Sequence, residues 1–186
     1  MLVKPETVPE EPQKTNKSEV LKVYSPIIRS PKTWSDMSLL HPHEVIRRGL
    51  ETLLELVDNK CINSNSEPWK FQTLKKWFKN HLSFILHHHH TIEEEFFFPW
   101  IHERLDKIPE YSEPRVKFVA SHQELAIILV LMEEAQDIDR FRKLAFELSD
   151  EMIPHLNDEE SFYPKVLEKY FTEEEHAYAI DKIIQA

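Results

Sequence analysis

A single glycine, Gly49, occurs among the 186 residues, and this scarcity limits the folds that the chain can adopt. Glycine provides the positive φ angles and close backbone approaches that tight turns, barrels and phosphate-binding loops require. We therefore do not expect a Rossmann or P-loop fold. No stretch alternates with period two over the length of a strand, so the sequence predicts an all-α protein.

Apolar residues recur at helical spacing in four long segments. Proline and capping signals predict a first helix with Pro42 in its first turn and a second helix from Pro68 that ends or kinks at Pro99. A third helix is predicted after Pro114 to about Glu134. A fourth is predicted from Ile138 towards Phe162, with a kink at Pro154. The stretch CINSNS is a predicted loop. The helices and short connections together predict an antiparallel up-down-up-down four-helix bundle over residues 35–171.

Two further segments flank this bundle. Residues 1–18 are rich in Pro, Glu, Lys and Thr and are predicted to be disordered, because they have too little apolar surface to offset the entropy of ordering. The rest of the N-terminal region, which reaches Trp34, is predicted to be a packed, irregular arm. Thr172 and Glu175 form a T-x-x-E capping box, so residues 172–186 are predicted to form a short C-terminal helix that ends at Ala186.

Charge and composition exclude several partners and compartments. With 33 acidic and 23 basic residues and a net charge of -10, the surface repels phosphate, so we expect no nucleic-acid binding. No stretch approaches the ~20 apolar residues of a membrane span, and the N-terminus has no signal-peptide core. Cys61 is the sole cysteine, which favours a reducing compartment and predicts a cytoplasmic location. A protein partner stays unknown.

The segment HHHHTIEEEFFFPW carries the first sign of chemistry. His89 and Glu93 are four residues apart, so they share one helix face, which continues through Phe96 into the apolar stripe of the second helix. Both side chains are predicted to point inwards. His88 and His90 lie ~100° around the helix axis to either side of His89 and are predicted to cover the flanks of the second helix.

The fourth helix repeats this pattern in HLNDEESFYP, where His155 and Glu159 are again four residues apart on the apolar face. His122 is on the apolar face of the third helix and His43 on that of the first. The separations from His89 to His122 and from His122 to His155 are both 33 residues, which would bring the rings to similar heights in antiparallel helices.

One histidine in a core is usually a satisfied structural residue, but an unpaired buried carboxylate costs several kcal/mol. Two glutamates and four histidines in one core have few metal-free solutions, whereas a pair of cations satisfies them directly. The predicted metal ligands are His43, His89, Glu93, His122, His155 and Glu159. Their nitrogen and oxygen donors suit Fe, Mn and Zn.

These motifs resemble the hemerythrin family in its broad form, the HHE cation-binding domain. The resemblance covers about Leu39 to Tyr170 and is based on His43, HHTIE before FFFP, the lone His122, and HLNDE before SFYP. It implies that the four histidines are terminal ligands of two iron ions, bridged by Glu93 and Glu159 beside an oxo or hydroxo group. Manganese or zinc stays possible.

The sequence departs from the oxygen-carrying members of that family. Their third helix has two histidines four residues apart, whereas here Ala126 follows His122, and their last carboxylate is an Asp five residues after its histidine. One iron would lack an imidazole, leaving room for water, O2 or a carboxylate such as Glu151. The remaining set is similar to that of the hemerythrin-like domain of an F-box iron sensor, which makes sensing of iron or oxygen an option.

The leading hypothesis is therefore a diiron protein that binds or senses O2, a related small ligand or iron itself, with an apolar shell of Phe96, Phe97, Phe162 and Leu129. No catalytic residue is assigned, and a binder is favoured over an enzyme. The rivals are a diiron oxidase or peroxidase-like enzyme, which the absent imidazole favours, and an interaction module that the metal only stabilises. A ferritin-like site is not expected, because the ExxH pair of that class occurs only at Glu173 and His176, in a segment predicted to lie at the surface.

Overall fold

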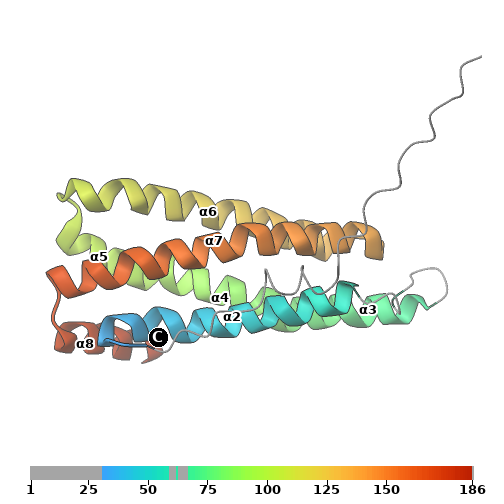
Figure 1. Ribbon diagram of the computed structural model, residues 1–186, viewed down its shortest axis with the longest axis horizontal. Coiled ribbons are helices and arrows are strands. Elements are labelled where there is room, and N and C mark those ends of the chain that lie inside the picture. Colours follow the sequence, from blue (N-terminus) through green and yellow to red (C-terminus); the bar gives the residue numbers. More distant parts are fainter. Residues whose placement is uncertain (1–30, 59–61, 63–66, 186) are drawn as a thin grey trace, which may run out of the picture.

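The computed structural model describes residues 31–58, 62 and 67–185, and these form helices with no strand among them. The all-α prediction is confirmed, and the long helices lie side by side as a bundle (Figure 1). The helices are α2 (Trp34–Asp58), α3 (Pro68–Trp77), α4 (Phe84–Ile92), α5 (Phe98–Leu105), α6 (Pro109–Glu134), α7 (Ile138–Tyr170) and α8 (Glu173–Gln185). The predicted tail, most of the arm, most of the CINSNS loop and Ala186 fall outside the described residues.

Two helices begin earlier than the prolines predict. Helix α2 begins at Trp34 rather than near Pro42, because the Asp36 carboxylate accepts hydrogen bonds from the backbone N–H groups of residues 32 and 33 and so caps an earlier turn. Helix α6 begins at Pro109, whose missing N–H is not needed in a first turn, and then passes through Pro114. Trp34, assigned to the arm by the sequence, is therefore the first residue of a helix.

The second predicted helix does not end at Pro99 but continues to Leu105. Helices α3, α4 and α5 are joined end to end by two π-helical segments, η1 (Phe78–Ser83) and η2 (Glu93–Phe97). We call this continuous helical unit, residues 68–105, the rod. Pro99 cannot donate to the carbonyl four residues back, and just before it the Phe98 N–H donates to the carbonyl of Glu93, five residues back. This wider turn changes which aromatic side chains face the core: Phe97 and Phe98 are buried, whereas Phe96, predicted to point inwards, is 39% exposed.

The predicted start of the fourth helix is confirmed at Ile138, where the Asp137 side chain accepts the N–H of Arg140. The helix continues through Pro154 and Pro164 to Tyr170. The T-x-x-E capping box of α8 is also confirmed, with Thr172 N to Glu175 Oε2 at 2.9 Å and Glu175 N to Thr172 Oγ1 at 3.2 Å. Helix α8 lies beside the start of α2 at one end of the bundle (Figure 1).

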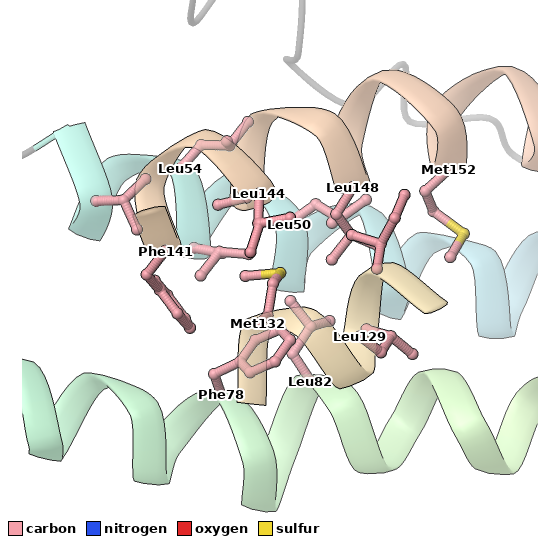
Figure 2. Packing of buried hydrophobic residues seen from close by; sticks show 14 of the residues in the cluster. Leu50, Leu54, Phe78, Leu82, Leu129, Met132, Phe141, Leu144, Leu148 and Met152 are labelled. Atoms are coloured by element: carbon pink, nitrogen blue, oxygen red, sulfur yellow. The ribbon is translucent and has the colours of Figure 1, made fainter. Parts of the chain in front are cut away.

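Helix α7 packs against both α2 and α6, and leucine, phenylalanine and methionine side chains fill the space between the helices (Figure 2). Gly49 lets α2 approach the rod closely, since a Cβ there would lie 2.6 Å from Leu82 Cδ1. None of the described helices has both the length and the apolar composition needed to cross a membrane.

The core divides into two apolar clusters. One fills the half of the bundle that contains Leu50, Phe78 and Leu144, and the other is rich in aromatic side chains such as Phe98 and Tyr163. On each long helix a histidine lies between residues of the two clusters: between Leu39 and Ile46 on α2, Leu86 and Phe97 on the rod, Phe118 and Leu125 on α6, and Met152 and Tyr163 on α7. A polar layer therefore separates the clusters.

Candidate metal centre

The structure brings all six sequence-predicted side chains together in this polar layer. They are His43, His89, Glu93, His122, His155 and Glu159. Glu159 is 0% exposed, Glu93 3%, and the four histidines are all buried. Groups that prefer water thus meet where water is largely excluded, so they need partners of another kind.

The Glu93 carboxylate lies between two sets of imidazoles. Its Oε1 atom is 3.3 Å from His89 Nε2 and 4.0 Å from His43 Nε2. Its Oε2 atom is 3.5 Å from His122 Nε2. The two oxygens of one carboxylate therefore face different histidines, the arrangement needed to bridge two cations.

The Glu159 carboxylate approaches the same layer from α7. Its Oε2 atom is 3.5 Å from His43 Nε2 and 3.4 Å from His155 Nε2, and its Oε1 atom is 3.7 Å from His122 Nε2. Each carboxylate thus contacts histidines from at least two helices. The pattern H-x-x-x-E places the pair correctly on both helices because residues four apart lie on one face.

A seventh residue, His90, joins the layer, and here the sequence prediction is wrong. His90 is 7% exposed rather than on a flank, its ring stacks on that of His122 with centroids 4.0 Å apart, and it meets the His155 ring edge-on at 5.6 Å. Helix α4 lies within a bundle and has neighbours on two sides, so its inward face is wide enough for two adjacent residues. His89 faces α2, where its ring is 5.0 Å from that of His43, and His90 faces α6.

A signal for His90 was present in the sequence. Phe78, Leu82, Leu86 and His90 follow one another at four-residue intervals, and the first three are all in the core. His88, by contrast, is exposed, as predicted. Glu151, considered as a substitute ligand, is exposed and belongs to neither group of donor atoms.

The donor atoms fall into two groups that suit one cation each: His90, His122 and His155 form one group, and His43, His89, Glu93 and Glu159 form the other. Within each group the donor atoms lie within 4.8 Å of one another. His122 Nε2 and His155 Nε2 are 3.1 Å apart, close to the ~3 Å expected for two ligands at right angles, each ~2.1 Å from one ion.

Buried polar atoms without hydrogen bonds show whether these residues suit a metal ion. The Nε2 atoms of His43, His89 and His90 and both carboxylate oxygens of Glu93 and Glu159 are buried without a hydrogen bond, although they lie near one another. Buried polar atoms are nearly always hydrogen-bonded. A layer with this many unpaired nitrogen and oxygen atoms therefore requires an explanation. Cations coordinated by these nitrogens and oxygens would satisfy all of them, and the residues therefore fit a dinuclear centre.

Two glutamates hold the far side of the imidazoles. Glu160 Oε1 accepts from His43 Nδ1 at 2.9 Å and from Arg47 Nη1 at 2.6 Å, and Glu94 Oε1 lies 3.0 Å from His122 Nδ1. A hydrogen bond at Nδ1 fixes the ring and leaves Nε2 with a lone pair for a cation. Glu160 could not be identified from the sequence, because Arg47 and Glu160 are brought together only by the packing of α2 on α7.

The electrostatics divide the histidines into two kinds. Burial lowers the pKa of His89 to about 4 and that of His155 to about 3, and also lowers that of His90, so these rings are neutral, as ligands must be. For His43, burial opposes protonation, but the hydrogen bond to Glu160 and the carboxylates of Glu93 and Glu159 raise the pKa to about 9. The pKa of His122 is raised in the same way, mainly by Glu159 and Glu93. Without a cation, these two rings carry the positive charge that the carboxylates require.

The ExxH pair of α8 is not part of this layer. His176 is buried, contrary to the sequence prediction, but its Nε2 atom pairs with Ser38 Oγ at 3.0 Å. It therefore fastens α8 to α2.

Comparison with known proteins agrees with the geometry. The family model described as "Hemerythrin HHE cation binding domain" matches residues 38–166, which include all seven residues of the layer. No curated protein and no solved structure matches the chain.

Proposed function

The chain belongs to the hemerythrin HHE cation-binding domain family, and from this premise we propose that it binds two iron ions in the polar layer and there binds or senses O2, a related small ligand or iron itself. The observation that carries the proposal is the buried set of unpaired ligand atoms on Glu93, Glu159 and the histidines. Manganese and zinc are the competing metals, because the same donors suit them.

Five histidines, rather than four, would hold the metal. His90 would take the place of the imidazole that the sequence lacks at Ala126, so one ion would have three imidazoles and the other would have His43 and His89. Glu93 and Glu159 would be shared, since each has an oxygen within 3.7 Å of a histidine of either group. The ion beside His43 and His89 then has one protein donor fewer, and a small external ligand would bind there. Iron, when bound, supplies the electrons for reversible binding of such a ligand.

The chain's own residues provide the surroundings for this chemistry. Phe97 and Leu129, two members of the predicted shell, are buried and limit access of water, whereas Phe96 is exposed and Phe162 half-buried. Glu160 and Glu94 keep His43 and His122 oriented. The complete histidine set weakens the oxidase alternative, which rested on an absent imidazole, and favours stoichiometric binding over turnover.

The proposal is tested by metal analysis of protein purified without added metal, followed by an absorption spectrum after exposure of the reduced protein to oxygen. We expect two iron ions per chain and new visible absorption bands. Glu93→Ala should abolish this binding, and the matched variant Glu95→Ala, which changes an exposed residue two positions away, should keep it. Less than one iron per chain would contradict the proposal, and a spectrum that oxygen leaves unchanged would contradict its oxygen-binding part.

Two finer predictions belong with this proposal. The up-down-up-down order of the four long helices is supported by the packing of α7 against both α2 and α6. A cytoplasmic location is supported by the single cysteine, which cannot form an intrachain disulfide and so favours a reducing compartment.

A further inference from the structure

A cavity of about 340 Å³ lies between the start of α2, the rod and α8. Its wall is mainly apolar and includes Met37 and Leu39 of α2, Ile92 and Phe97 of the rod, and Ile180 and Ile183 of α8. Cavities that hold small organic ligands are typically ~300–1,000 Å³, so this one exceeds the needs of a diatomic molecule.

The cavity reaches the polar layer. His89 and Glu93 both line it, so its inner end meets the two-histidine side of the layer. A second cavity, of about 280 Å³, reaches His155 from the opposite side, but Lys117, Glu124 and Asp158 line it. An apolar molecule would therefore enter on the side of α8.

Helix α8 forms one wall and lies outside the matched family region, which ends at residue 166. Its first turn is fixed by the capping box and by Arg104, which pairs with Glu175 at 2.5 Å and 2.9 Å. The Ser38–His176 hydrogen bond ties the next turn to α2. With its N-terminal end held, the helix presents isoleucines to the cavity.

We propose that this cavity, which we call the α8 chamber, binds a small, uncharged, largely apolar organic molecule next to the metal layer. The isoleucines of α8 would contact its apolar body, and the polar groups of the metal layer that line the cavity, His89 and Glu93, would meet its head. Ser38 and His41 of α2 complete the polar part of the lining. A negative charge on the ligand is disfavoured because the mainly apolar lining has no Lys or Arg to pair with it. The role of this molecule at the metal rests on the proposed function, but the chamber itself is a property of the metal-free chain.

Fluorobenzene is the probe that tests the proposal, with binding followed by ¹⁹F NMR on the full metal-free chain. We expect a dissociation constant on the order of 1 mM, as for other very small apolar ligands. Fluorobenzoate, which has a similar ring and a negative charge, should bind at least tenfold more weakly. No binding of fluorobenzene, or equal binding of both probes, would overturn the proposal.

Three variants locate the site. Ile180→Trp fills the chamber from a half-buried position and should weaken binding of fluorobenzene at least tenfold. Tyr178→Trp introduces the same side chain at a residue that is 66% exposed and outside the chamber, and binding should change less than twofold. If Ile180→Trp does not fold, Ile184→Asp at the 77% exposed rim should still weaken binding. Unchanged affinity in the folded chamber variants would overturn the proposal.

Iron uptake, measured after portions of the same metal-free chain and variants are reconstituted with ferrous iron, separates the two proposals. Two iron ions per chain with no fluorobenzene binding would refute the α8 chamber alone. Fluorobenzene binding that Ile180→Trp abolishes, in a chain that takes up no iron, would refute the metal function alone.

Discussion

Replacing His90 with alanine tests the assignment that the sequence did not predict. If His90 is a fifth imidazole ligand, His90→Ala should lower the iron content from two ions per chain to one. The matched variant His88→Ala removes the same side chain two positions earlier, from an exposed site, and should keep both ions.

The effect of His90→Ala on the metal-free chain should be small. Removing a buried ring from its contact with His122 leaves a cavity, which costs ~2–3 kcal/mol at a core position. The same change also removes the buried His90 Nε2 atom, which has no hydrogen bond and itself costs ~1–3 kcal/mol. The two effects oppose each other, so the net change in the free energy of unfolding should lie between a gain of about 1 kcal/mol and a loss of about 2 kcal/mol.

In the iron-loaded chain the same change should be much larger. A metal site that loses one ligand and binds its ion about 100-fold more weakly loses about 2.7 kcal/mol of metal-linked stability. Denaturant unfolding with and without iron measures both values, and elemental analysis gives the iron content.

Equal iron content in His90→Ala and His88→Ala, with equal stabilisation by iron, would refute the reasoning. His90 would then be a core histidine that packs beside the site without binding a cation. His88→Ala should lie within about 0.5 kcal/mol of the original chain in both states, since exposed substitutions rarely have larger effects.

Three further predictions concern the same layer. Adding Ala126→His to His90→Ala should restore part of the second ion, because position 126 is one turn after His122, and elemental analysis measures it. Glu160→Gln should weaken iron binding about 10- to 100-fold, because the Glu160 carboxylate orients His43. Glu147→Gln, at an exposed position, should leave iron binding unchanged. Titration against a competing chelator measures both affinities. For the metal-free chain, the free energy of unfolding should fall as pH is lowered from 6.5 to about 4. Burial lowers the pKa of His89 to about 4 and that of His155 to about 3, so the unfolded chain binds more protons than the folded chain in this window. Each of the two residues contributes up to about 3 kcal/mol to this loss. His43, with its pKa raised to about 9, adds stability that is fully present below pH 6.5 and is lost as pH rises through 9. Denaturant unfolding measures both trends: stability that rises as pH is lowered from 6.5 to 4 would contradict the lowered pKa values of His89 and His155, and stability that does not fall between pH 6.5 and 9 would contradict the raised pKa of His43.

Much of the fold could be predicted from local patterns. Spacing alone placed His89 with Glu93 and His155 with Glu159, because a regular helix fixes the relative direction of residues four apart. Caps were reliable where a side chain pairs with the backbone nearby, as Thr172 and Glu175 do. Prolines were less reliable, because a long helix tolerates one missing hydrogen bond when tertiary packing supports it, as at Pro114.

The residues that escaped prediction depend on neighbours distant in the sequence. A single apolar stripe could not show that α4 has partners on two sides, which is what turns both His89 and His90 inwards. The pairing of Arg47 with Glu160 depends on how α2 lies against α7. The inward turn of Phe98 and the outward turn of Phe96 depend on a change of helical winding that the sequence before Pro99 does not indicate.

The π-helical turn at η2 has a consequence for the comparison of relatives. It accommodates one residue more than an α-helical turn would between the His89–Glu93 pair and the aromatic residues that follow. A homologue that is wound regularly here would be one residue shorter, and its alignment with this chain would contain a single-position gap inside a helix. Such a gap would reflect a difference in coiling, and the ligands on one side and the aromatic cluster on the other would still correspond one to one.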